Sequence, residues 1–317
     1  MSTVHTAEAR EGSASLEVVR PGALTTVQDE GRPGHAHLGV PRSGALDAHA
    51  HRLANRLVGN PLDAATLETT LDGVALRALT PVTVAVTGAP CPVRVDGRPA
   101  PWGARTRIPA GALLDVGRPT AGLRTYVAFA GGITVEPVLG SRSTDLLSGL
   151  GPAPLTAGRL LPLGTPHAAP SGVDTVPWQA PPAELVLPLH PGPRDDWFTA
   201  EAHRTLAAPG YRVSPSANRI GLRTQGPALA RARHGELPSE GMVLGAVQVP
   251  PDGLPVVFLA DHPVTGGYPV IGVVPEEHLP AAAQAVPGTP IRFVLRRWRA
   301  TGPRSNFGEQ VLRHAEL

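Results

Sequence analysis

Glycine and proline interrupt this chain so often that long helices cannot form along most of it. Its 317 residues include 36 glycines and 37 prolines, and both residue types disfavour the interior of a helix. Short runs of valine, leucine and threonine lie between them, with Asp-Gly pairs at 72–73 and 96–97 where hairpin turns are expected. The sequence therefore predicts a mainly β protein with a few short helices.

The expected elements follow from the hydrophobic periods. The clearest helix pattern covers 44–58, with Ser43 as its expected N-cap and Gly59 after its end. Two further helices are expected at 196–207, capped by Asp195 or Asp196, and at 278–285, with Pro280 near the first turn. Strands are expected at 16–20, 66–71, 82–87, 91–95, 113–116, 123–130, 184–189, 211–214, 220–224, 243–249, 256–260, 270–274 and 290–295.

Composition along the chain predicts its division into parts. Residues 1–14 are polar and small, which is typical of a disordered tail. Two strand-rich subdomains are expected at 15–165 and 184–299, joined by a linker at 166–183 that is rich in proline, glycine and alanine. Residues 300–317 are expected to form a second tail.

The charged residues and the cysteine exclude several kinds of chemistry. All 28 basic residues are arginine, so a phosphate-loop lysine, a Schiff-base lysine and a biotinyl lysine are excluded in this chain. The arginines are spread along the sequence and aromatic residues are scarce, which does not favour nucleic-acid binding. Cys91 is the only cysteine, so no disulfide or cysteine metal site is expected, and it is interpreted as a small buried residue.

No membrane or metal function is predicted either. No stretch approaches the roughly 20 apolar residues that span a bilayer, and the first residues lack the apolar core of a signal peptide. We therefore expect a cytoplasmic protein without a membrane partner. The pairs His35/His37 and His49/His51 are each spaced by two residues, and on a helix that spacing points the rings apart, so no metal site is predicted.

A long polar loop is expected from Thr25 to Asp47. It reads TTVQDEGRPGHAHLGVPRSGALD, a composition that suits neither a regular strand nor a regular helix. Long ordered loops that concentrate polar residues commonly bind ligands. The candidate site residues in this loop are Gln28, Asp29, Arg32, Ser43, Gly44 and Asp47.

Three further loops place charge beside glycine. One covers 139–145, with Ser141 and Arg142, and another covers 217–227, with Asn218 and Arg219. The last runs through 234–241, 245–250 and 260–269. Its candidates are Glu236, Ser239, Glu240, Gln248, Asp261, His262, Thr265, Gly266, Gly267 and Tyr268.

These residue types favour anion recognition and acid–base chemistry. Arg32, Arg142 and Arg219 are the candidate clamp for a carboxylate or phosphate, because guanidinium groups bind such anions in a bidentate manner. The amides of the Gly266-Gly267 pair are placed to stabilise an oxyanion. We assign catalytic roles to Asp29, Arg32, Arg142, Asp261, His262 and Tyr268. Arg219 and the other candidates are assigned to substrate binding, and structural turn chemistry is the alternative for any single residue.

The loop motifs resemble a known family. TVQDEGRPGHAHLGVPRSGALD, GGITVEPVLGSRSTD, NRIGLR, HGELPSEGMVLGAVQVPPDG and DHPVTGGYPVIGVV are similar to the biotin-dependent carboxyltransferase / allophanate hydrolase subunit 2 family. The resemblance covers about residues 16–295. The chain departs from many members at Pro263-Val264-Thr265, where they carry Gln-Thr-Thr, so no role of that glutamine is carried over.

The resemblance implies a fold, partners and an activity. The fold would be two cyclophilin-like β-barrel subdomains. The family's 5-oxoprolinase members imply two partner proteins, a homologous one of the B type and a LamB/YcsF-like one of the A type. They also imply ATP-dependent phosphorylation of the small-molecule substrate 5-oxoproline, with magnesium beside the ATP, and ring opening to glutamate.

Two alternatives remain open within the same resemblance. In the first alternative, the chain is a carboxyltransferase component that acts on urea or a related amide with carboxybiotin, which would require a biotin carrier on another protein. In the second alternative, the chain is a non-catalytic regulatory partner of a kinase-inhibitor-like protein.

Overall fold

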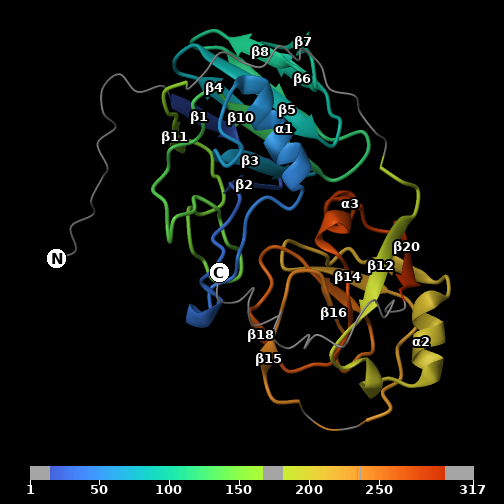
Figure 1. Ribbon diagram of the computed structural model, residues 1–317. Coiled ribbons are helices and arrows are strands. Elements are labelled where there is room, and N and C mark those ends of the chain that lie inside the picture. Colours follow the sequence, from blue (N-terminus) through green and yellow to red (C-terminus); the bar gives the residue numbers. More distant parts are fainter. Residues whose placement is uncertain (1–14, 167–180, 234, 236, 297–317) are drawn as a thin grey trace.

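The computed structural model describes residues 15–166, 181–233, 235 and 237–296. The expected tails at 1–14 and 300–317, and most of the expected linker, lie outside these ranges. Figure 1 shows two β-rich halves, one built from the blue to green part of the chain and one from the yellow to red part. The mainly β prediction with a few short helices is confirmed.

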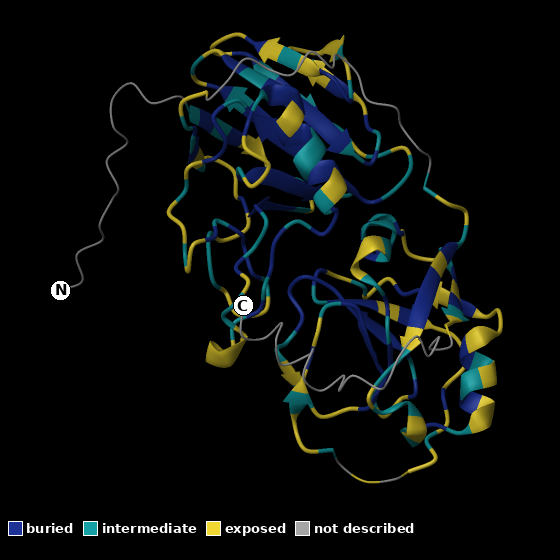
Figure 2. Ribbon diagram, in the orientation of Figure 1, coloured by how far each residue is buried: buried dark blue, intermediate teal, exposed yellow. Residues whose placement is uncertain are grey.

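The first half is built from two sheets. One has the strand order β11(Leu160–Pro162), β1(Ser15–Arg20), β4(Val74–Ala78), β9(Leu113–Val116), β6(Val93–Val95), β7(Arg98–Ala100). The other has the order β2(Leu24–Gln28), β3(Thr66–Thr70), β10(Arg124–Phe129), β5(Val82–Gly88), β8(Arg105–Ile108). The inward residues of both sheets, such as Leu76 and Phe129, form a single buried core (Figure 2). Cys91 belongs to this core as expected, and burial raises the pKa of its thiol to about 12.

Helix α1(Ala48–Val58) covers the outer face of the five-stranded sheet. Because side chains alternate along a strand, Val127 and Phe129 of β10 face the core between the sheets while Tyr126 and Ala128 face α1. The predicted N-cap Ser43 is wrong, because the Asp47 carboxylate accepts a hydrogen bond from the amide of Ala50 and caps the helix. Gly59 ends the helix with a positive φ of 78°, as predicted.

The second half contains a closed barrel. Its strands run in the order β12(Leu185–Pro191), β19(Val270–Val273), β16(Ala246–Gln248), β17(Val256–Phe258), β14(Gly221–Gln225), β13(Tyr211–Val213), β20(Pro290–Leu295). Helix α2(Ala200–Ala207) and helix α3(Leu279–Gln284) pack against the barrel core. Thr199 rather than Asp195 or Asp196 caps α2, because the acidic pair lies in the short helix η2(Asp195–Trp197).

A small ribbon lies outside the barrel. It pairs β15(Glu240–Gly241) with β18(Thr265–Gly266). Met242 beside this ribbon joins Val256, Phe258 and Val270 of the barrel strands in a separate buried cluster. The ribbon therefore packs on the outer face of the barrel.

The loop expected from Thr25 to Asp47 contains two regular elements. Its first residues belong to β2, which pairs with β3 from Leu24↔Thr70 to Gln28↔Thr66, and the short helix η1(Ala36–Leu38) lies further on. The prediction of a continuous irregular loop was wrong here because β2 is a buried polar strand. The hydroxyl of Thr25 bonds the carbonyl of Pro21, and the Gln28 amide bonds Thr26.

The two halves share side chains across their boundary. Leu46, which precedes α1, packs in the core of the second half. Gln284 at the end of α3 binds the first half, since its Oε1 accepts from the amides of Leu123 and Arg124 and its Nε2 donates to Asp47. These contacts fix the halves around the site described next. Within the described residues, no helix is long and apolar enough to cross a membrane.

Candidate functional site

Arg219 lies at the centre of a fully buried ion network between the halves. Its guanidinium donates two hydrogen bonds to Asp261, each of 2.9 Å, and one to Glu68. A fourth bond of 2.7 Å goes to the carbonyl of Gly44. Burial alone would lower the pKa of Arg219, but the attraction of Asp261 and Glu68 outweighs burial and the net pKa is raised. This side chain therefore stays charged.

Glu68 joins this network from strand β3 in the first half. It accepts hydrogen bonds from the Tyr126 hydroxyl at 2.8 Å and from the amide of Leu46 at 3.0 Å. Burial alone raises the pKa of Glu68, but the nearby Arg219 and Arg124 outweigh it and the net pKa is lowered. Glu68 therefore ties Arg219 to the sheet beneath α1.

Asp261 joins the network from the second half. Besides Arg219, it accepts a hydrogen bond of 2.8 Å from the hydroxyl of Ser43 and one of 3.3 Å from the amide of Leu146. Ser43 has a positive φ of 56°, and its amide bonds the carbonyl of Ala260. Three of the four predicted loops therefore meet at this carboxylate.

Gly44 permits the chain to turn next to Ser43. Its φ is 96°, and a Cβ there would lie 2.9 Å from the amide nitrogen of Gly31 and 3.0 Å from the carbonyl carbon of Glu30. Both neighbours are backbone atoms, which cannot move independently of the loop. The position therefore excludes any side chain.

We expect Gly44→Ala to lower the free energy of unfolding by about 1–3 kcal/mol, from a strained backbone and a steric clash. Gly111→Ala is the matched control, because Gly111 also has a positive φ, 79°, but an added Cβ there meets nothing within 4 Å. Chemical denaturation of both variants separates the two contributions. Equal losses would show that the clash at Gly44 contributes nothing.

Asp29 holds the second predicted loop against the first. Its carboxylate accepts hydrogen bonds from the hydroxyls of Ser141 and Ser143, both 2.6 Å, and from the amides of Arg142 at 2.5 Å and Gly31 at 2.8 Å. Four donors saturate this buried carboxylate. Asp29 therefore holds the two loops together beside the cleft and acts as a loop organiser.

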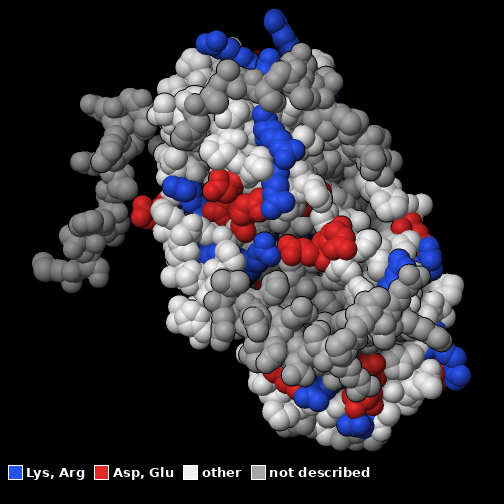
Figure 3. Space-filling model, in the orientation of Figure 1, with Lys and Arg blue, Asp and Glu red and all other residues white. Residues whose placement is uncertain are grey.

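A cleft of about 270 Å³ lies between the halves beside this network. Its apolar lining comes from both halves and includes Ala45, Leu46, Leu244, Leu259 and Leu279. Its charged lining consists of four carboxylates and two arginines, which are Asp29, Glu30, Glu276, Glu277, Arg42 and Arg52. On the face in Figure 3, acidic and basic side chains gather where the halves meet.

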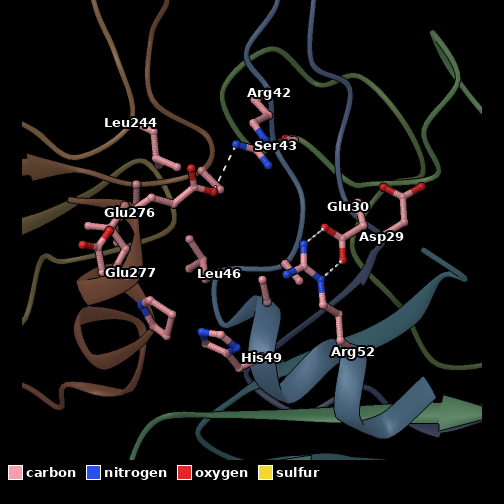
Figure 4. A pocket seen from close by; sticks show the side chains of 16 residues that line it. Asp29, Glu30, Arg42, Ser43, Leu46, His49, Arg52, Leu244, Glu276 and Glu277 are labelled. Atoms are coloured by element: carbon pink, nitrogen blue, oxygen red, sulfur yellow. Dashed lines mark hydrogen bonds and ion pairs between the residues drawn. The ribbon is translucent and has the colours of Figure 1, made fainter. Parts of the chain in front are cut away.

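Figure 4 shows how the charged groups of the cleft are arranged. Arg52 of α1 donates two hydrogen bonds to Glu30, of 2.7 and 2.5 Å. Arg42 donates one bond of 3.2 Å to Glu276, which starts the short helix η3(Glu276–His278) in the second half. Glu277 also lines the cleft, and its side chain forms no hydrogen bond with the described residues.

The three arginines predicted as a clamp do not meet in this cleft. Arg219 is buried in the ion network described above. The Arg32 side chain is also buried and bonds the carbonyls of Val138 and Ser143, while its Nη1 has no partner among the described residues. Burial lowers the pKa of Arg32. Arg142 is half-buried and bonds the carbonyl of Val135 at 2.9 Å.

Other candidates lie close to the network but serve local contacts. His262 stacks on Phe258 with ring centroids 5.8 Å apart and bonds the carbonyl of Pro263, and burial lowers its pKa. The Asn218 side chain accepts bonds from the amides of Ile220 and Gly221 in a turn. Burial raises the pKa of Asp47.

The fourth predicted loop lies mainly on the ribbon. Tyr268, Ser239, Thr265 and Gly267 are exposed, and Gly266 pairs with Glu240 in the ribbon. Glu240 forms an ion pair with Arg194, and the Gln248 amide donates to the carbonyl of Tyr268 at 3.2 Å. None of these residues lines the cleft, and Glu236 lies outside the described residues. The catalytic role of Tyr268 and the substrate-binding roles of the others stay a prediction.

Sequence reasoning missed several residues of the site. Glu68 and Tyr126 lie in strands that read as ordinary core, and Glu276 and Glu277 precede a helix that the sequence placed correctly but did not connect to the site. Glu68 carried one usable signal, because a lone carboxylate in a buried strand requires a partner.

Taken together, the geometry defines a mainly β protein whose two halves enclose a polar cleft over a buried ion network. The sequence model for the family described as "Carboxyltransferase domain, subdomain A and B" matches residues 38–295. The chain belongs to this family.

Its relatives fall into two groups. The chain is 39% identical to the 5-oxoprolinase C subunit of Escherichia coli over an alignment 285 residues long, which covers 88% of this chain and 90% of that protein. It is 34% identical to "Urea amidolyase" of Lachancea kluyveri over an alignment 307 residues long, which covers 88% of this chain but 17% of that protein.

Two solved structures match the chain along most of its length. The crystal structure of TTHA0988 matches with a TM-score of 0.82 at 39% identity, covering 90% of this chain and 57% of that one. The Kluyveromyces lactis urea amidolyase matches with a TM-score of 0.83 at 30% identity, covering 92% of this chain and 19% of that one. The chain thus spans little more than half of the first and a fifth of the second.

Proposed function

We propose that this chain is the C subunit of a 5-oxoprolinase and that the cleft between its halves holds the lactam while it is opened to glutamate. The observation that carries the proposal is the 39% identity along 90% of the E. coli 5-oxoprolinase C subunit. The protein of the same name from Haemophilus influenzae is 31% identical over 90% of its length. The partners in this proposal are the homologous protein of the B type and the LamB/YcsF-like protein of the A type.

The cleft suits a small lactam better than it suits ATP with magnesium. Four carboxylates against two arginines repel a triphosphate, and each arginine is already paired with a glutamate. The described residues also contain no group of three histidine, cysteine, aspartate or glutamate side chains placed to hold a metal ion. The residues therefore do not fit ATP, and no step through the nucleotide is assigned to this cleft.

The cleft residues supply binding and exclusion of water. Carboxylates that line it, such as Glu277, are acceptors for the N–H of an amide, and a guanidinium is a donor for its oxygens. Leu46, Leu244 and Leu279 give the apolar wall that a ring of methylene groups requires. In this proposal the chain orients the lactam, and the buried network keeps the two walls in place.

Reconstitution of the complex tests this function. We expect ATP hydrolysis that depends on 5-oxoproline and releases glutamate when this chain is co-expressed with the homologous B-type protein and the LamB/YcsF-like protein. The same preparation without this chain is the control and is expected to be inactive. Hydrolysis that proceeds equally without 5-oxoproline, or without this chain, would refute the proposal.

Carboxyl transfer is the second candidate function. It is favoured by the 34% identity to the L. kluyveri urea amidolyase and by the match to the K. lactis structure. Since the chain has no lysine, carboxybiotin would have to arrive on another protein. Carboxylation of urea by this chain with a biotinylated carrier, and no response to 5-oxoproline, would select this alternative.

A further inference from the structure

The ion pair between Arg42 and Glu276 joins the two halves at the cleft. Arg42 follows η1 in the first half and Glu276 begins η3 in the second. Figure 4 shows the guanidinium and the carboxylate facing each other across the cleft lining. A single hydrogen bond of 3.2 Å connects them, and their side chains are 39% and 68% exposed.

The other arginine of the cleft is bound differently. Arg52 holds Glu30 with two hydrogen bonds in a bidentate pair, and Glu30 is 26% exposed. Exposed single-bond ion pairs are worth only about 0–1 kcal/mol, whereas bidentate pairs are stronger and fix their geometry. Of the two arginines in the cleft, Arg42 is therefore the one whose partner exchanges easily.

We propose that Arg42 determines the specificity of the cleft by recognising a carboxylate on the ligand, which takes the place of Glu276. This inference rests on the proposed function and names the feature of the substrate that is read. The guanidinium offers five N–H donors, and its Nη1 makes the one side-chain hydrogen bond found among the described residues. A small lactam that carries a carboxylate, such as 5-oxoproline, meets this requirement, and urea does not.

The charge of the cleft makes the exchange necessary. With four carboxylates and two arginines in the lining, one more anion is unfavourable unless a resident carboxylate moves away. Glu276 is the resident carboxylate that is most exposed among those in ion pairs here, so it can turn into solvent. The ligand carboxylate then replaces Glu276 beside Arg42, and the charge around the guanidinium stays the same.

Binding measurements on the full-length chain and on the reconstituted complex test this inference. The probes are 5-oxoproline, the unsubstituted lactam 2-pyrrolidinone, and urea, each titrated by calorimetry. We expect Arg42→Gln to weaken 5-oxoproline binding roughly ten- to a hundredfold, the worth of a hydrogen-bonded charge pair. Binding of 2-pyrrolidinone is expected to change by less than about twofold.

Glu276→Gln separates ligand recognition from a structural role of the ion pair. Both substitutions remove the same ion pair between the halves, so a merely structural pair would give the same direction of effect. If Arg42 binds the ligand carboxylate, we expect the two substitutions to have opposite effects. Glu276→Gln then removes the competing carboxylate and tightens 5-oxoproline binding by roughly two- to tenfold. Arg118→Gln is the charge-matched control, since Arg118 pairs with exposed Asp72 and does not line the cleft.

Two results would overturn the inference. One is equal weakening of 5-oxoproline and 2-pyrrolidinone by Arg42→Gln, and the other is no 5-oxoproline binding by either the chain or the complex. Failure of the proposed function looks different: carboxylate-selective binding that follows Arg42 would persist, but ATP hydrolysis would not respond to 5-oxoproline.

Discussion

Replacing Arg219 with methionine is expected to lower the free energy of unfolding by about 3–5 kcal/mol, the cost of breaking a buried ion pair from one side. The side chain is 1% exposed and is the shared partner of Glu68 and Asp261, which are equally buried. Methionine fills much of the volume but removes the ion-pair partner of Asp261 and leaves Glu68 with Arg124 alone, at 3.6 Å. Urea denaturation followed by circular dichroism measures the loss.

Arg212→Met is the matched control. Arg212 makes one exposed hydrogen bond of 3.1 Å to the carbonyl of Gly288, so its replacement is expected to cost less than about 1 kcal/mol. If Arg219→Met cost no more than this control, the network would not hold the halves together. The contacts of Arg219 with Gly44 and Asp261 would then be incidental to stability.

The loss is also expected to depend on pH, and its direction follows from Glu68. The pKa of Glu68 is lowered in the folded protein, because its arginine partners outweigh burial. Its contribution is therefore present above the pKa of the unfolded chain and is lost as the pH falls through the folded pKa. The difference between wild type and Arg219→Met should be largest near neutral pH and shrink as the pH falls below about 4. A constant difference across that range would assign the loss to packing.

Local patterns were enough to predict most of the fold. Short apolar runs between glycines and prolines located the main strands, and Gly59 marked the end of α1 correctly. The start of α1 was misplaced because Ser43 and Asp47 are both good capping residues, and a contact between the halves decides between them. The Ser43 hydroxyl is held by Asp261, more than two hundred positions away, so only Asp47 is free to cap.

The site was harder to predict because it depends on pairing across the chain. Sequence reasoning brought Ser43, Gly44, Arg219 and Asp261 into one site, and the structure does place them in contact. It also predicted that Arg32, Arg142 and Arg219, each in a polar loop that contains glycine, form an anion clamp. Burial and pairing decide which arginine can bind a ligand. An arginine is available to a ligand only if its bond to its own protein partner is weak, and that depends on tertiary structure.

Replacing Asp29 with alanine is expected to destabilise the protein by about 2–4 kcal/mol, because the substitution strands buried donors from two loops. The hydroxyls of Ser141 and Ser143 and the amides of Gly31 and Arg142 all lose their acceptor. The loss should exceed that of any single serine substitution, since each serine removes only one of these bonds. Thermal and chemical denaturation measure the effect.

Asp252→Ala supplies the comparison for Asp29→Ala, because the Asp252 carboxylate accepts one exposed bond from the amide of Leu254. We expect that variant to lose less than about 1 kcal/mol. Glu30 follows Asp29 directly and lines the cleft with it, so Asp29→Ala should also weaken 5-oxoproline binding under conditions where the variant remains folded. Unchanged stability together with lost turnover would instead assign Asp29 to catalysis, because a loop organiser cannot lose its bonds without affecting the fold.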